Sequence, residues 1–140
     1  MIKLELPLKY IVNKKKSINY SLNDFLLPLG SANVFSTYHI LKAKRSLIAH
    51  VESLCKGLSP IKEQSDLRVE LKVFRATNHR SDVDNRVILA KYATDTLVKC
   101  GIVEDDGFKF IREITIVDCG LDENNPRCEY YIGRDEEFLW

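Results

Sequence analysis

A chain of 140 residues suits one compact domain, and its apolar fraction of 45% is enough to build a hydrophobic core. The 21 basic and 20 acidic residues leave a formal net charge of +1, which excludes the strongly basic composition of many nucleic-acid-binding domains but not a local basic surface. The four cysteines lack C-x-x-C spacing for a zinc site, and no apolar run is long enough to span a membrane. We therefore expect a cytoplasmic protein with reduced thiols and no membrane partner.

The first third of the chain predicts a strand followed by loops. Ile2, Leu4 and Leu6 alternate with polar residues, so we expect the first strand from Ile2 to Val12. The segment from Ser17 to Asn33 is rich in Asn, Ser, Pro and Gly, which favours loops and short turns.

Three consecutive lysines, Lys14, Lys15 and Lys16, separate these two segments. Such a triplet is typical of a solvated loop. The alternative is contact with nucleic-acid phosphates, whose charge lysines neutralise. The residues alone leave both interpretations open.

Hydrophobic periodicity predicts the remaining elements. They are a helix from Ser36 or Thr37 to about Gly57, a half-buried strand from Leu67 to Ala76, a helix from Asp84 to Cys100, and strands from Phe108 to Val117 and from Cys128 to Ile132. A turn at residues 122–126 would place Cys119 opposite Cys128 across a hairpin. Residues 133–140 form an acidic tail, for which a frayed end is the default. We expect one domain over 1–140, of α/β class and α+β type, with a small mixed sheet packed with two main helices.

Two aspartates, Asp82 and Asp84, stand at the start of the second predicted helix. One aspartate there is an ordinary helix cap, but the second is surplus, and in an extended segment the two carboxylates share a side. Asp105 and Asp106 follow the same helix. Because Mg²⁺ prefers carboxylate oxygens, this distribution indicates a divalent-metal site. A calcium-binding EF-hand loop is excluded because Val87 would replace its invariant glycine.

The same helix predicts a polar line beside an apolar stripe, which is formed by Val87, Ala90, Thr94 and Leu97. At 100° per residue, Asp84, Lys91 and Asp95 lie within a sector of about 40°. The simplest interpretation of Lys91 and Asp95 is a surface ion pair at i,i+4 spacing, worth a few tenths of a kcal/mol.

The motifs in this region resemble the RusA family of Holliday junction resolvases. The resemblance rests on Asp82-Val83-Asp84-Asn85, on a helix with Lys91 and Asp95-Thr96-Leu97, and on Gly101 followed by Asp105-Asp106 before a strand. It covers about 35 residues, and the order of the motifs between two predicted strands adds specificity. Ser17-Ile18-Asn19 is a weaker similarity to the Ser-x-Asn segment that follows the family's first strand.

This resemblance implies a RusA-like, homodimeric endonuclease of bacterial or phage origin that requires Mg²⁺, with Mn²⁺ as a substitute. Such enzymes resolve four-way DNA junctions by paired nicks during recombination and repair. Carried over by position, Asp82, Asp84 and Asp106 would be the catalytic metal ligands, and Lys91 would act near the scissile phosphate. Phosphate contacts would come from Lys14, Lys15, Lys16, Arg75, Arg80 and Arg86.

The position of the lysine departs from the family pattern. There it follows the second aspartate by one helical turn, whereas Lys91 follows Asp84 by seven residues and Ile88 occupies the one-turn position. We therefore expect a helix about one turn longer, with Arg86 or Lys91 in the lysine's role.

The sequence leaves three alternatives to a junction-resolving endonuclease. They are a nuclease for other branched DNA, a structure-selective DNA-binding module without catalysis, and an interaction protein whose acidic residues only cap a helix.

Overall fold

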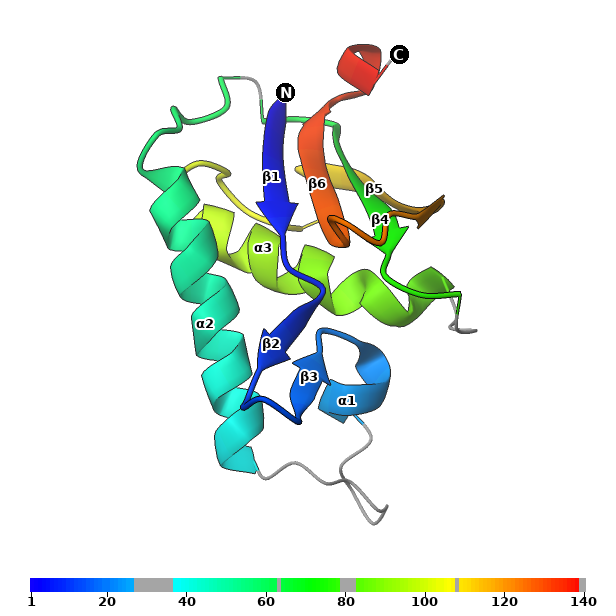
Figure 1. Ribbon diagram of the computed structural model, residues 1–140. Coiled ribbons are helices and arrows are strands. Elements are labelled where there is room, and N and C mark those ends of the chain that lie inside the picture. The colour runs from blue at the N-terminus through cyan, green and yellow to red at the C-terminus, as the bar shows by residue number, and fades with distance from the viewer. Residues whose placement is uncertain (27–36, 63, 79–82, 108, 139–140) are drawn as a thin grey trace.

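The chain forms a four-stranded mixed sheet flanked by two long helices (Figure 1). This computed structural model describes residues 1–26, 37–62, 64–78, 83–107 and 109–138. The strands, in spatial order, are β1 (Ile2–Leu6), β6 (Arg127–Arg134), β4 (Leu67–Arg75) and β5 (Ile111–Leu121). Strand β6 is antiparallel to both β1 and β4, whereas β4 and β5 are parallel. The expected α+β class with a small mixed sheet is confirmed.

The N-terminal segment departs from the expected single strand. Strand β1, which lies at the edge of the sheet, ends at Leu6, directly before Pro7. Strand β2 (Lys9–Ile11) instead pairs with β3 (Ser17–Asn19) in a separate two-stranded sheet, and the short helix α1 (Leu22–Leu26) follows. The expectation of mostly loops and short turns from Ser17 onward therefore did not include β3 and α1.

Both long helices form where the periodicity predicts them. Helix α2 spans Thr37–Cys55, and α3 spans Val87–Lys99. The 3₁₀ turn η1 (Val83–Arg86) precedes α3, so the first residues of the predicted helix wind more tightly. Because β4 and β5 are parallel, α3 provides the crossover that returns the chain to the same end of the sheet.

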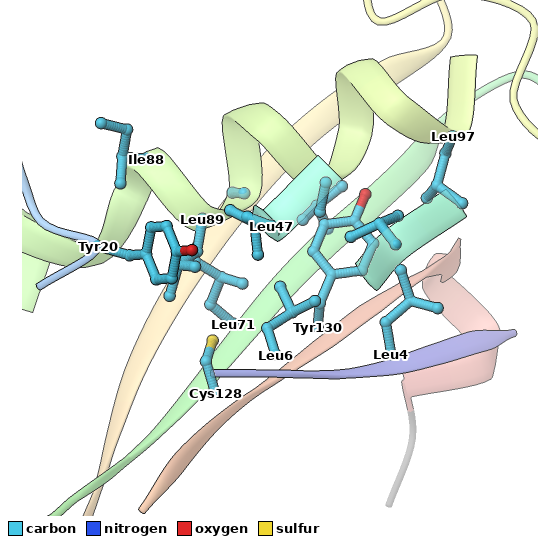
Figure 2. Packing of buried hydrophobic residues seen from close by; sticks show 14 of the residues in the cluster. Leu4, Leu6, Tyr20, Leu47, Leu71, Ile88, Leu89, Leu97, Cys128 and Tyr130 are labelled. Atoms are coloured by element: carbon cyan, nitrogen blue, oxygen red, sulfur yellow. The ribbon is translucent and has the colours of Figure 1, made fainter. Parts of the chain in front are cut away.

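The core lies where α2 and α3 pack against each other and, together with one face of the sheet, enclose the buried side chains (Figure 2). Leu89 and Leu97 of α3, Leu47 of α2 and Tyr130 of β6 have no exposed surface. The hydroxyl of Tyr130 lies 2.7 Å from the Thr94 hydroxyl, so the one polar group of this large side chain is satisfied. The predicted apolar stripe is only partly correct, because Val87 is half-buried whereas Leu89 is at the centre.

Strand β4 is more buried than the expected half-buried strand. Its alternate residues Leu67, Val69 and Leu71 face the core, but Glu70 on the other face is only 6% exposed. Arg68 pairs with Glu70 at 3.1 Å, and this contact compensates the buried carboxylate.

The C-terminal segment is not a frayed tail over the part that the structure describes. Gly133 and Arg134 continue β6, and the 3₁₀ turn η2 (Asp135–Phe138) follows. The Phe138 side chain is buried, and Glu137 pairs with the amino group of Met1. The two chain ends are thereby held together, as Figure 1 also shows.

The expected hairpin between the last two strands does not form. Strand β4 lies between β5 and β6, so the turn after Leu121 crosses the end of β4. Cys119 on β5 is exposed and Cys128 on β6 is buried, and both are free thiols.

Replacing Tyr20 by Phe tests a buried phenol that joins the N-terminal segment to α2. The Tyr20 hydroxyl donates to the Ala43 carbonyl at 2.6 Å, and burial raises the pKa of Tyr20 to about 12 from an ordinary value of 10.0. We expect Tyr20→Phe to lower the free energy of unfolding by about 1 kcal/mol at pH 7, measured by urea unfolding.

The pH dependence of this difference has a defined sign. The phenol's contribution is complete below pH 10.0, where it is neutral in both states, and is lost as the pH rises towards about 12. The stability difference between wild type and Tyr20→Phe should therefore narrow above pH 10.0. Tyr38→Phe removes an exposed phenol and is the matched control, with little change expected. Equal stability of wild type and Tyr20→Phe at pH 7 would contradict this role.

Candidate active site

The predicted acidic residues lie along the connection from β4 through η1 and α3 to β5. Asp84 is exposed in η1, directly before α3. It does not cap the helix, because Arg86 occupies the N-cap position and no side-chain hydrogen bond caps α3. The interpretation of Asp84 as an ordinary helix cap is therefore not supported. Asp82 lies outside the described residues.

A sharp reversal after α3 brings the second acidic segment back along the helix. Gly101 has a φ of 77°, a left-handed conformation that glycine adopts without steric cost. The Ile102 N–H donates to the Leu97 carbonyl at 2.9 Å and the Gly101 N–H to the Val98 carbonyl at 3.0 Å, which is the Schellman pattern of a helix end. Ile102 and Val103 are buried, so the reversed segment is anchored in the core.

The reversal places Asp106 beside Lys91, in the middle of α3. The Lys91 Nζ lies 3.5 Å from a carboxylate oxygen of Asp106 and 3.2 Å from one of Asp95. A carboxylate oxygen of Asp105 accepts the backbone N–H of Asp106 at 2.8 Å. The predicted pair of Lys91 and Asp95 is thus confirmed, and Asp106, which helix spacing alone could not place beside them, joins it. The i,i+4 spacing was the visible signal, and the path of the chain after Gly101 supplies the third member.

The contact between Lys91 and Asp106 favours the charged form of both side chains. The pKa of Lys91 is raised, first by its hydrogen bond to Asp95 and then by the charges of Asp95 and Asp106. Slight burial opposes ionisation of Asp106, but hydrogen bonding with Asp95 and the charge of Lys91 outweigh it and lower the pKa of Asp106. Lys91 is therefore a cation at neutral pH and is suited to charge neutralisation rather than to proton abstraction.

The extra residues between Asp84 and Lys91 form the η1 turn rather than a longer α-helix. Counted from the start of α3 at Val87, Lys91 stands one turn into the helix. Seven residues at helical rise nevertheless separate Asp84 from Lys91 by roughly 10 Å along the axis. Among the residues that the structure describes, no group of three or more His, Cys, Asp or Glu side chains is placed to hold a metal ion. The metal roles of Asp82, Asp84 and Asp106 stay predictions.

A groove with a volume of about 620 Å³ adjoins η1 on the side of the N-terminal strands. Its walls include Asn85 and Arg86 of η1, Arg75 at the end of β4, and Lys9 and Asn19 of the small sheet. Cations and amide groups that line a concave surface can contact phosphate or sugar oxygens. The sequence did not identify this groove, because it joins segments that are far apart in the chain.

The residues that the sequence predicted to contact phosphate have different roles in the folded chain. Lys14, Lys15 and Lys16 are exposed in the turn between β2 and β3, where the Asn13 side chain accepts the N–H groups of Lys15 and Lys16 at 2.8 and 3.0 Å. The predicted loop is confirmed, and its contact with phosphate stays a prediction.

The two described arginines of that set are engaged within the chain. Arg75 donates to Asp118 at 2.9 Å, and Arg86 donates to the carbonyls of Leu8 and Tyr20 at 2.7 and 3.2 Å. Burial lowers the pKa of the Arg86 guanidinium. Arg86 therefore fixes η1 to the N-terminal segment, so it has a structural role that the sequence did not predict. Arg80 lies outside the described residues.

No family model matches the chain, and no curated protein matches it significantly. Among the helices of the described residues, none is both long and apolar enough to cross a membrane.

Replacing Lys91 by Met tests the charge cluster without assuming any function. The substitution removes the cation that favours ionised Asp106, so we expect the pKa of the Asp106 carboxyl to rise, measured by NMR titration of the labelled side chain. Lys99→Met is the matched control, because Lys99 is also exposed on α3 but pairs with Glu52 at 3.0 Å. A pKa of Asp106 that does not respond to Lys91→Met, or responds equally to Lys99→Met, would contradict the cluster.

Proposed function

We propose that this protein is a RusA-like, Mg²⁺-dependent endonuclease that resolves four-way DNA junctions by paired nicks. The observation that carries the proposal is the contact of Lys91 with Asp106 at 3.5 Å. These two residues are 15 positions apart in the sequence, and the resemblance assigned both to one active site. Their contact supports that joint assignment.

The donor set is compatible with the proposed cation. Asp84 and Asp106, together with Asp82, offer only carboxylate oxygens, which are hard ligands that Mg²⁺ and Mn²⁺ accept. When bound, the cation would activate a water molecule for attack on the phosphodiester and stabilise the charge that develops on the phosphate.

Lys91 contributes a fixed positive charge near the phosphate. Because Asp95 and Asp106 both hold it in place, its position is defined before substrate binds. Such preorganised charge lowers the barrier without reorganisation during the reaction. An entering phosphate would share the Lys91 ammonium with these two carboxylates.

Junction DNA would be recognised by shape and by its backbone. The lysines at the tip of the β2–β3 turn extend one wall of the groove, since Ile11 and Ser17 at the strand ends line it. Phosphate contacts of this kind position a duplex without reading its sequence. A homodimer would present two active sites related by two-fold symmetry, as paired nicks require. A cytoplasmic setting in a bacterium or phage-infected cell belongs to the same proposal.

A DNA-binding module without catalysis is the second candidate. It is supported by the exposed lysines of the β2–β3 turn and by the groove lined by Lys9, Asn19 and Arg75, which could contact nucleic acid whether or not a phosphodiester bond is broken. The two candidates share the groove and the exposed lysines and differ only in whether a phosphodiester bond is broken.

The test is to incubate the purified protein with a synthetic four-way junction, with Mg²⁺ or with EDTA, and to resolve the products on a denaturing gel. We expect paired nicks with Mg²⁺ only, and a loss of at least about 100-fold in nicking rate for Asp84→Asn and for Asp106→Asn. Glu136→Gln removes one exposed carboxylate from η2, which follows Arg134 opposite the start of β4 and so lies at the end of that strand away from η1, and it should leave the rate unchanged.

Binding measured in parallel separates the alternatives. Junction binding without nicking in Mg²⁺ or Mn²⁺ would select the binding module, and preferential cleavage of forks or flaps would select another branched-DNA nuclease. If Asp84→Asn nicks as fast as wild type, the assigned site is wrong. If the protein shows no DNA binding that weakens with salt, both the nuclease functions and the DNA-binding module are excluded.

A further inference from the structure

Strand β5 forms a long and open edge of the main sheet. It has 11 residues, and among the strands of the described residues only β4 pairs with it. Its register with β4 is regular from Glu113 to Asp118, and the irregularities lie only beyond those two residues. Such an edge presents backbone N–H and C=O groups that can pair with a further strand. Lys and Pro, which often protect sheet edges, are both absent from β5.

The core of the protein does not cover the apolar side chains of this strand. Ile114 lies opposite Val69 of β4, which has no exposed surface, so both residues are on the face of the sheet that carries the core. Ile114 is nevertheless 53% exposed. On the other face, Val117 is 38% exposed. Both faces of β5 therefore offer apolar surface to a partner at the edge.

The opposite edge of the sheet differs from β5. Strand β1 has only five residues, and α2 lies against it. The Nε2 of His50 on α2 lies 2.7 Å from the carbonyl oxygen of Glu5 on β1. A helix side chain thus already contacts the backbone of β1, which leaves β5 as the edge that is suited to strand pairing.

The sequence of β5 is complementary to itself in an antiparallel arrangement. If a two-fold axis passes through Thr115, Ile114 lies opposite Ile116 of a second copy, and Arg112 lies opposite its Asp118. Pairs of β-branched residues and pairs of opposite charge both stabilise neighbouring strands. An axis through Ile114 or Ile116 would instead place Arg112 opposite Ile116 or Gly120, and the ion pair would be lost.

We propose that two copies of this chain form a dimer by pairing their β5 strands antiparallel, with Thr115 on the two-fold axis. The two four-stranded sheets then become one continuous sheet. Both copies use the same surface, so the assembly closes at two subunits. Junction resolution needs two subunits, but this interface does not depend on catalysis.

The two charged residues can both accept a partner across the axis. Within its own chain Arg112 contacts Asp135, and Asp118 contacts Arg75 at 2.9 Å. The Arg112 and Asp118 side chains are still 52% and 42% exposed, so each keeps surface for a second contact. Because the axis repeats the ion pair at both ends of the paired strands, one substitution changes two contacts.

The experiment measures the dimer dissociation constant of the full chain by sedimentation velocity, without DNA or Mg²⁺. We expect a wild-type dimer. Arg112→Glu places like negative charges opposite each other and Asp118→Lys like positive charges, so each variant should raise the dissociation constant by about tenfold or more. Glu5→Lys reverses an exposed charge on β1 and is the matched control, with no change expected.

An equimolar mixture of the two variants tests the register itself. In the mixed dimer, each end of the paired strands again joins a carboxylate to a cation, so dimerisation should return. The lost contacts with Asp135 or Arg75 are within one chain, and mixing cannot restore them. Rescue by mixing therefore distinguishes the interface from a defect of the single chain.

Three results would overturn the proposal: a monomeric wild type, which would leave the edge for a strand of a different protein; a dimer that neither charge reversal weakens; and weakened variants that mixing does not rescue. The junction assay is independent of these outcomes. Paired nicking by a chain that gives one of them would retain the proposed function and reject this interface. Rescue by mixing in a chain that does not nick would retain the interface and reject the nuclease.

Discussion

The burial of one face of α3 is the interaction on which the rest of the structure depends. Leu89 and Leu97 have no exposed surface, and they belong to the one buried cluster that also contains side chains of α2 and of the sheet. At roughly 25 cal/mol per Å² of apolar surface removed from water, such side chains contribute about 2 kcal/mol each. The same rotation of the helix turns Lys91 and Asp95 outwards, so the hydrophobic contact also fixes the orientation of the charged cluster.

Apart from the Nε of Arg68, the buried side-chain nitrogen and oxygen atoms of the described residues have hydrogen-bond partners. Tyr130 pairs its hydroxyl with Thr94, and Tyr20 pairs its own with the Ala43 carbonyl. Glu129, only 7% exposed on the opposite face of the sheet, contacts Arg127 at 2.8 Å and the Tyr131 hydroxyl at 2.6 Å. Burial opposes its charge, but these partners outweigh burial and lower the pKa of Glu129. Charged residues that alternate along β4 and β6 can therefore cover this face of the sheet themselves.

Local periodicity was sufficient to predict both long helices and strands β4, β5 and β6, because each carries its own repeat of apolar residues. It was not sufficient for β2 and β3, because strands of three residues each are too short to show an apolar repeat of their own. Periodicity also could not predict which strands pair with one another. The turn residues between β5 and β6 predict that these two strands pair as a hairpin. In the structure β4 lies between them, so they do not pair.

The candidate site likewise has some contacts that the sequence predicted and others that it could not predict. Spacing on a helix predicted that Lys91 and Asp95 meet, because that relation is local. The contact with Asp106 depends on the left-handed Gly101 and on the buried side chains after it, so it needs the three-dimensional path. The internal use of Arg86 was equally hidden, because its acceptors, Leu8 and Tyr20, are more than 60 residues away in the chain.

The sheet order has a consequence for the time course of folding. Strand β1 is made first, yet within the described residues its ladder partner is β6, with Ile2 opposite Ile132. Strand β6 also separates β1 from β4, so neither pairing can form until β6, whose Ile132 follows Ile2 by 130 positions (132 minus 2), has been synthesised. Contacts so distant in sequence carry a large loop-closure cost and form late. Until β6 is available, α2 and the unit formed by β4, α3 and β5 can only pack around an incomplete core. The last part of the hydrophobic surface is covered when β6 pairs with β1.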